Sequence, residues 1–163
     1  MIADEINFCP RCGSAVTQAE RYGRLRTVCP ACGWTYFADP KVAAAAIVEQ
    51  DGRVLLVRRA VDPARGLWTL PAGFVDAGED PALAAQRECL EETGLVVAIT
   101  GLKEVLFGQE HPGGAHILIV YYARLVSGEL AAHDDVDQVA YFSRTDLPPL
   151  AFSTTKRLLL KTL

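Results

Sequence analysis

Acidic residues crowd into one short segment of the chain. Glu88, Glu91 and Glu92 lie within five residues of one another, directly after Arg87, and Glu79 lies upstream in the same segment. Like charges three and four residues apart on a helix repel each other, whereas an ordinary solvated helix face pairs glutamate with lysine. Hard divalent cations such as Mg²⁺ prefer carboxylate oxygens together with substrate phosphate oxygens. The spacing therefore favours a metal site over a solvated charged face.

Four of the five cysteines form a second candidate metal site. They occur as CPRC and CPAC, sixteen residues apart, and each pair is followed by glycine. This spacing is typical of a tetrahedral zinc site whose four thiolates leave no open coordination position, so we expect a structural ion. A redox dithiol is the alternative, but a redox CxxC usually stands alone beside a βαβ unit. The predicted zinc ligands are Cys9, Cys12, Cys29 and Cys32.

A helix is needed to position the carboxylates. Asp80 and Pro81 are typical of an N-cap and first helical residue, and Gly94 is typical of a helix end. At about 100° per residue, Glu88, Glu91 and Glu92 fall on one side of this helix. The opposite side is mostly apolar, so we expect it to pack against the core. Its residues are Leu83, Gln86, Cys89, Leu90 and Thr93, with Cys89 as a small core side chain rather than a nucleophile.

The remaining pattern predicts one main sheet. Residues 42–49 and 53–59 favour two strands joined at a turn containing Gly52, and residues 115–125 and 139–142 favour two more. A C-terminal helix follows, with Ser153 as its expected N-cap. A hairpin with its turn near Gly23 is expected between the two cysteine pairs. We therefore expect a mixed α/β sandwich over residues 39–163, preceded by a small metal-braced segment over residues 1–38.

The bulk composition excludes several classes of protein. A formal charge of −4 and a pI near 5.4 argue against binding to nucleic acid or anionic lipid through bulk charge. The N-terminal residues lack the features of a secretory signal, and no window of eighteen residues is continuously apolar. An odd cysteine count fits a reducing compartment, so we expect a cytoplasmic protein without a membrane span. A bound cation, rather than net charge, would then attract a phosphate substrate.

From Gly73 to Leu95 the chain resembles the Nudix box, G-x5-E-x7-R-E-U-x-E-E-x-G-U, where U is a bulky aliphatic residue. Every fixed position matches, and the one departure is Cys89 at a U position. The two CPxCG pairs, a linker containing proline, and LWTLPAGF together resemble the zinc-ribbon subgroup of Nudix hydrolases. The resemblance covers most of the chain and is least specific after about residue 100.

This resemblance implies a Nudix-type α/β/α sandwich that hydrolyses a nucleoside diphosphate linked to another moiety. It implies that Glu88, Glu91 and Glu92 hold Mg²⁺ or Mn²⁺, joined by the carbonyl of Gly73. It also implies that Arg87 orients these carboxylates rather than binding substrate. Glu79 would then lie behind the metal ligands or reach the metal through water.

The general base has several candidates. In the family it is either a glutamate of the box or an acid from a downstream loop. Glu110 and Asp135 are the main loop candidates, with His111 and Asp134 beside them, although a single loop acid is more often simply solvated. Phe74 and Tyr122 lie near the site, and we expect them to pack in the core rather than stack on a base.

The resemblance favours an ADP-containing substrate without choosing among FAD, ADP-ribose and NAD(H). The absence of an SQPWP-like signature after the box disfavours NADH, Pro112 weakly favours ADP-ribose, and LAFSTTK resembles a branch with FAD-cleaving enzymes. Because Nudix enzymes are often dimers, a homodimer is one expectation, and nucleic acid is not an expected partner. Two alternatives stay open. One is a non-catalytic nucleotide sensor, and the other is an enzyme of capped RNA whose ribbon carries the basic cluster of Arg21, Arg24 and Arg26.

Overall fold

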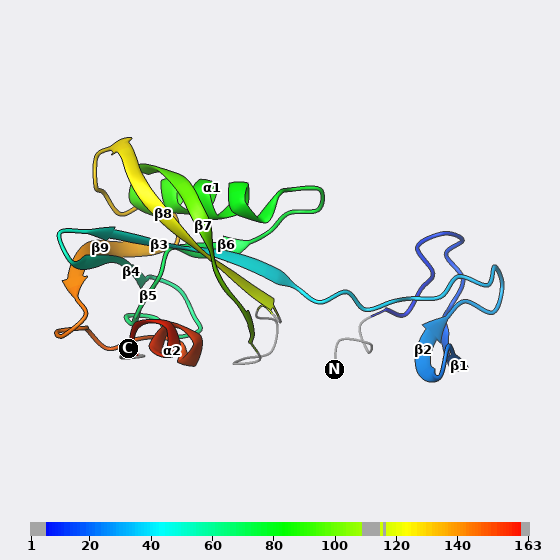
Figure 1. Cartoon of the computed structure of the whole chain (residues 1–163). Helices are drawn as coiled ribbons and strands as arrows, with labels where there is room; N and C mark the ends of the chain where they lie inside the picture. The colour runs from blue at the N-terminus through cyan, green and yellow to red at the C-terminus, as the bar shows by residue number, and fades with distance from the viewer. Residues whose placement is uncertain (1–5, 109–114, 116, 161–163) are drawn as a thin grey trace. The chain divides into compact units, whose positions relative to one another are not determined.

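The structure, a computed structural model, describes residues 6–108, 115 and 117–160 (Figure 1). The chain divides into two compact units, residues 1–40 and residues 41–163. Each unit has its own secondary structure, and each is described here by itself. Among the described residues, no helix has the length and apolar character needed to cross a membrane.

The smaller unit is a hairpin between two cysteine turns. Strands β1 (Thr17–Arg21) and β2 (Arg24–Val28) pair in antiparallel register around Tyr22 and Gly23. Both turn residues have positive φ, 53° and 72°, as a tight two-residue hairpin turn requires. The hairpin expected between the cysteine pairs is therefore confirmed.

The larger unit contains a mixed sheet. Its described strands are β3 (Val42–Gln50), β4 (Arg53–Arg59), β5 (Trp68–Thr69), β6 (Ala72–Phe74), β7 (Leu95–Phe107), β8 (Ile117–Gly128) and β9 (Val136–Ser143). They run in the order β5-β4-β3-β8-β7, with β6 paired to β3 and β9 paired to β4. The β3–β8 pair is parallel and the other pairs are antiparallel. The predicted mixed sheet is therefore confirmed.

Two helices cover opposite faces of this sheet. Helix α1 (Pro81–Thr93) and helix α2 (Ser153–Leu160) lie on either side of it in Figure 1. Strand β3 shows why, because its alternate side chains enter different clusters. Ala44 packs with Ala84 and Ala85 of α1, whereas Ala45 and Ile47 belong to the cluster that contains Leu158 and Leu159 of α2. Both faces of β3 are buried, which gives the predicted α/β/α sandwich.

Helix α1 packs differently from the sequence expectation. Leu83 is 58% exposed and Leu90 47% exposed, although both were expected to pack against the core. The buried residues of α1 are Ala84, Ala85, Cys89, Glu92 and Thr93. The helix lies against the alanine-rich strand β3, so small side chains fill the contact and the leucines fall outside it.

Three further details differ from the expectation. Strand β7 was not identified from its sequence, in which three polar residues and a glycine interrupt the apolar positions of residues 95–107. Strand β9 begins at Val136, earlier than expected, and helix α2 begins at Ser153 itself rather than after it.

Candidate active site

The ends of α1 are set by local interactions. The Asp80 carboxylate accepts a hydrogen bond from the Ala82 amide at 2.7 Å, and Pro81 occupies the first turn. At the other end Gly94 has φ 72° and its N–H donates to the Leu90 carbonyl at 2.9 Å. The predicted helix limits are confirmed. Because Glu88 and Glu92 are four residues apart inside this helix, their side chains project from the same face.

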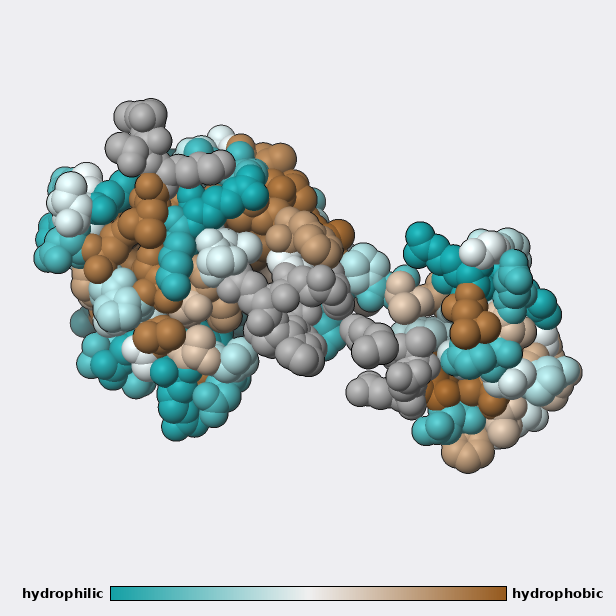
Figure 2. Space-filling view, turned by 90° about the horizontal axis from the view of Figure 1, so that it is seen from below, coloured by the Kyte–Doolittle hydropathy of each residue, from teal (hydrophilic) through white to brown (hydrophobic). Residues whose placement is uncertain are grey.

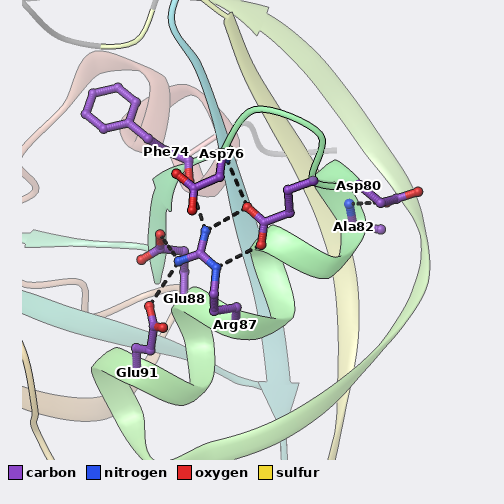
Figure 3. Close-up of polar contacts among 8 residues, drawn as sticks. Phe74, Asp76, Asp80, Ala82, Arg87, Glu88 and Glu91 are labelled. Atoms are coloured by element: carbon purple, nitrogen blue, oxygen red, sulfur yellow. Dashed lines mark hydrogen bonds and ion pairs between the residues drawn. The ribbon is translucent and has the colours of Figure 1, made fainter.

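Arg87 joins the preceding loop to the helix (Figure 3). Its Nε and Nη2 donate to the two carboxylate oxygens of Glu79, at 2.8 and 2.9 Å. Its Nη1 donates to Glu88 at 2.7 Å and Glu91 at 3.0 Å, and Nη2 also donates to the Phe74 carbonyl at 3.0 Å. The guanidinium is thus occupied by groups of the box itself, the arrangement of a positioning residue.

Glu79 is committed to this network. Hydrogen bonds from Arg87, and then one from the Asp76 amide at 3.0 Å, lower the pKa of Glu79 to about 2. Both oxygens of this carboxylate accept from Arg87. Its contacts therefore hold the loop between Phe74 and Glu79 against α1.

Glu88 lies against the backbone of Gly73. A Cβ atom at Gly73 would collide with the carboxylate of Glu88, so only glycine leaves room for this approach. Burial raises the pKa of Glu88 even though Arg87 donates to it. The first glycine of the motif thus has a geometric role here, because it lets a main-chain segment and a half-buried carboxylate come together.

Glu92 is the most buried of the acids on α1. It is 4% exposed, and its Oε2 accepts a hydrogen bond from the Ala72 amide at 3.1 Å. Burial, and then the charge of Asp135, raise the pKa of Glu92 well above its ordinary value. Within the described part of the chain Glu92 has no ion pair. A carboxylate in this position is poorly compensated by the protein alone.

Glu88 and Glu92 line a cavity of about 470 Å³. Its walls come from β3, β4, β5, β6, β8, α1 and α2, and from the segments around residues 62, 134 and 152. Glu88, Glu92 and Gly73 are part of the lining, whereas Glu79 and the exposed Glu91 are not. The other lining residues are Ala43, Ala45, Arg59, Val61, Asp62, Pro63, Thr69, Leu70, Ala72, Phe74, Gly108, Ala115, Leu118, Asp134, Asp135, Phe152 and Thr155.

A downstream loop brings two more acids to this cavity. The His133 amide donates to the Glu92 carbonyl at 3.1 Å, and the Ala60 amide donates to the Asp135 carbonyl at 2.8 Å. Asp134 has φ 55°, an unusual conformation for a residue other than glycine, and such conformations cluster at functional sites. Asp134 and Asp135 therefore lie beside the box acids, about forty residues away in sequence. Glu110, His111 and Pro112 lie outside the described residues.

Three lining residues were not identified from the sequence. Arg59, at the end of β4, is the one positively charged residue among the described residues of the lining, and its guanidinium lies over the Phe152 ring at 5.4 Å. Thr155 hydrogen bonds with Thr69 at 3.0 Å. The adjacent arginines that end β4, Arg58 and Arg59, were a signal that could have been used. Phe152 and Thr155 lie in the LAFSTTK segment, whose resemblance to FAD-cleaving enzymes suggested a substrate but no role for either residue.

The two aromatic residues considered from the sequence are not in the core. Phe74 is 48% exposed and lines the cavity, with the Lys41 amine 5.4 Å from its ring centre. Tyr122 is 38% exposed on β8. The expectation of core packing is wrong for both. Phe74 lies on the short strand β6, which pairs with β3. The neighbours of Tyr122 on β8, Tyr121 and Ala123, pack on the α1 side, so the Tyr122 side chain points to the opposite face of the strand.

The four predicted zinc ligands come together in the smaller unit. The sulfurs of Cys9 and Cys32 are 3.6 Å apart, those of Cys12 and Cys29 are 3.5 Å apart, and all four lie within 4.8 Å of one another. In each turn the glycine amide donates to the first cysteine's carbonyl, at 2.9 Å for Gly13 and 3.0 Å for Gly33. Zn–S bonds of about 2.3 Å in a tetrahedron place sulfurs about 3.8 Å apart, so the cluster has dimensions that suit zinc.

Comparison with known proteins gives a consistent set of relatives. A family model described as the NUDIX domain matches residues 39–163. The ADP-ribose pyrophosphatase of Methanocaldococcus jannaschii is 36% identical over 121 residues, which cover 74% of this chain and 72% of that protein. The NAD-capped RNA hydrolase NudC of Pseudomonas aeruginosa is 33% identical over 146 residues, which cover 88% of this chain and 50% of that protein.

A solved structure extends the similarity over both units. The crystal structure of a NUDIX hydrolase from Nitrosomonas europaea has a TM-score of 0.84 and 32% identity, and the match covers 96% of this chain and 89% of that chain. The present chain nevertheless spans only about half the length of the NudC relatives.

Proposed function

The chain belongs to the Nudix family, and from this membership we propose that it hydrolyses the diphosphate bridge of a nucleoside diphosphate linked to a second moiety. One observation carries the proposal. Glu88 and Glu92 lie in a single cavity with Asp134 and Asp135, although the two pairs are far apart in sequence. Glu92 is buried, Glu88 and Asp135 are half-buried and Asp134 is exposed. Such a concentration of acids needs positive charge, and a diphosphate substrate needs the same positive charge.

We propose that Mg²⁺ or Mn²⁺ supplies this charge. Glu88, Glu92 and the carbonyl of Gly73 would hold the ion, and Glu91 would contribute from the rim. The raised pKa values of Glu88 and Glu92 fit a cation in this place, because a cation would compensate carboxylates that burial otherwise disfavours. Oxygen ligands of this kind suit hard divalent ions. When bound, the ion neutralises the diphosphate and activates it toward attack by water.

The remaining residues would orient the substrate and the attacking water. Arg87 keeps Glu79, Glu88 and Glu91 in fixed positions through its hydrogen bonds, so the acids do not rearrange when substrate enters. Asp135, beside Glu92, is our proposed general base. Arg59 faces the same cavity and is well suited to pair with a phosphate oxygen. The apolar part of the cavity lining would then receive the nucleoside.

The proposed substrate class is an ADP-containing compound such as ADP-ribose, FAD or NAD(H). The cavity of about 470 Å³ falls in the range of small-molecule and cofactor sites. The similarity to an ADP-ribose pyrophosphatase over 72% of that protein supports the ADP moiety. The name of the NudC relatives supports a second candidate, an RNA that ends in a nucleotide cap, although this chain spans about half of their length.

The test is a metal titration with a panel of substrates. Purified protein would be incubated with ADP-ribose, FAD, NADH, CoA and dinucleoside polyphosphates, with Mg²⁺ or Mn²⁺ varied, and products would be separated by chromatography. We expect cleavage at the diphosphate of an ADP compound, yielding AMP, only when the metal is present. Tight binding of one compound without cleavage of any would instead identify a nucleotide sensor and contradict the enzymatic proposal.

For the smaller unit we propose a zinc ribbon over residues 1–38, with the Nudix domain over residues 39–163. Cys9, Cys12, Cys29 and Cys32 would hold a structural Zn²⁺ ion through four thiolates. A segment of this length cannot bury enough apolar surface to be stable alone, so the metal would supply its folding free energy.

A further inference from the structure

The ribbon hairpin exposes two aromatic rings. Tyr22, at the hairpin turn, is 79% exposed, and Phe37, in the segment after the second cysteine pair, is 48% exposed. Their ring centres are 5.8 Å apart, with an angle of 32° between the planes. Two neighbouring exposed rings form a small aromatic patch, and each ring offers a face onto which planar groups can stack.

Arginines surround these rings. The guanidinium of Arg26 lies over the Phe37 ring at 4.7 Å. In the hairpin register Arg21 and Arg24 are directly opposite each other, and Arg26 lies on the same side of the hairpin because residues two apart on a strand share a face. Like charges at opposite positions destabilise a strand pair. The pairing of Arg21 with Arg24 therefore lowers the stability of the hairpin.

The protein does not neutralise these charges locally. Among the described residues none of the three arginines has an ion pair, and the hydrogen bonds of Arg21 and Arg26 go to the main-chain carbonyls of Glu20 and Arg21. By contrast, Arg58, Arg87, Arg144 and Arg157 of the larger unit all contact carboxylates. The side of the ribbon that Figure 2 shows has small hydrophobic areas among hydrophilic residues. A purely apolar partner would leave the arginines unpaired.

We propose that Tyr22, Phe37 and the three arginines, which we call the hairpin platform, bind single-stranded nucleic acid. Bases would stack on the two rings and on the guanidinium plane of Arg26, while Arg21 and Arg24 would pair with backbone phosphates. Double helices do not present base faces for stacking, so the platform should discriminate against them. The acidic net charge of the whole chain predicted no nucleic-acid partner, but the relevant charge is local, since the hairpin holds three arginines and one glutamate.

Fluorescence anisotropy with the full-length, zinc-loaded protein tests this proposal. The probe is a labelled oligouridine of about 12 nucleotides with a 5′-hydroxyl end, so that the diphosphate-cleaving site is not engaged. Parallel titrations use a single DNA strand of the same length and a double-stranded oligonucleotide of the same length. We expect saturable binding of the single strands, at least tenfold weaker binding of the duplex, and a fall in affinity as salt rises because phosphate contacts release counterions.

Variants identify the surface. Tyr22→Ala and Phe37→Ala should each weaken binding about tenfold, since each removes one stacking ring. Replacing the three arginines with glutamine should weaken it further and flatten the salt dependence. Leu25→Ala is the matched control, because Leu25 is exposed on the opposite face of the same hairpin and should have no effect. Zinc content measured for every variant verifies that the ribbon is intact.

Several outcomes would overturn the proposal. These are the absence of saturable binding to either single strand, equal or better binding of the duplex, and unchanged affinity in both aromatic variants with normal zinc content. A loss in Leu25→Ala as large as that in Tyr22→Ala would also overturn it, because binding would then not depend on the platform. None of these outcomes bears on the hydrolytic proposal, which concerns the other unit.

Discussion

At the scale of single residues, the carboxylates of α1 differ in what surrounds them. Glu91 is exposed and shares Arg87 with Glu79 and Glu88, whereas Glu92 is buried beside Asp135 and receives one amide hydrogen bond. A buried, poorly compensated charge is disfavoured by desolvation, and proteins keep such charges chiefly where function requires them. The structure therefore ranks Glu92 and Glu88 above Glu91 as the acids on which the proposed metal depends.

Replacing Glu92 with glutamine tests this ranking. We expect Glu92→Gln to lower turnover by orders of magnitude and Glu91→Gln to lower it less, because only the first removes a charge inside the cavity. Glu92 has a raised pKa in the folded state, so ionised Glu92 lowers the stability of the metal-free protein as pH rises. Metal-free Glu92→Gln should thus be at least as stable as the wild type at pH 7 in urea titrations. Near-normal turnover of Glu92→Gln would remove this residue from the site.

The ion pair of Glu79 and Arg87 should make stability depend on pH in the sense opposite to Glu92, since ionised Glu79 stabilises the folded protein. The folded protein lowers the pKa of Glu79 from 4.5 to about 2, so ionised Glu79 stabilises the fold above pH 4.5. This contribution should disappear progressively as pH falls from about 4.5 to about 2. In Glu79→Gln that part of the acid dependence should be absent, which urea titrations at pH 3 and pH 7 measure against the wild type. An identical stability difference between the two pH values in both proteins would contradict the prediction.

At the scale of elements, helix α1 is positioned by small side chains. Ala84 and Ala85 are fully buried against Ala44 of β3, and the flanking leucines are largely outside the contact. Small residues allow a helix to approach a sheet closely, and this approach brings Glu92 within reach of the Ala72 amide, at the start of β6. The alanine-rich strand and helix are thus part of the site's construction, although no alanine carries chemistry.

A larger side chain at this contact should separate the helix from the sheet. We expect Ala85→Leu to destabilise the protein by about 1–3 kcal/mol, the usual range for overpacking, and to lower turnover by displacing Glu88 and Glu92. Leu83→Ala is the matched control on the exposed side of the same helix and should change stability by less than about 0.5 kcal/mol. Chemical denaturation and turnover of both variants check this. Greater destabilisation by Leu83→Ala than by Ala85→Leu would show that α1 packs through its leucines.

At the scale of the whole molecule, the chain combines two units that are stabilised in different ways. The larger unit has apolar clusters on both faces of a mixed sheet. The smaller unit has one short hairpin and a cluster of four cysteines, with several aromatic residues at its surface. Metal removal should therefore affect the two units very differently.

Cys9→Ser tests this difference. Loss of one thiolate should release zinc and unfold the ribbon, because we propose that the ion supplies most of its folding free energy. The Nudix domain should retain its thermal transition, and cleavage of a small nucleotide substrate should persist. Zinc analysis, calorimetry and turnover measure the three effects. Purified wild-type protein without zinc would contradict the metal assignment, and loss of the Nudix transition in Cys9→Ser would contradict the independence of the two units.

Features that depend on local spacing could be predicted from the sequence. The box residues from Gly73 to Leu95, the limits of α1 and the two cysteine pairs each involve neighbours in the chain, so residue types and intervals are sufficient to recognise them. The same spacing identified the family. The expected α/β/α sandwich followed from the order of the elements and from that resemblance.

Tertiary structure alone decided which residues meet at the cavity and which acids lose their solvent. Asp135, Arg59 and Phe152 line the same cavity as Glu92 from three separate segments. The pairing of β9 with β4 brings the loop before β9 to the end of β4, and Phe152 comes from the residue directly before α2. The burial of Glu92 and the exposure of Leu83 likewise depend on how closely α1 approaches β3. Non-local packing decides both, and periodicity within one helix carries no information about the surface on which that helix lies.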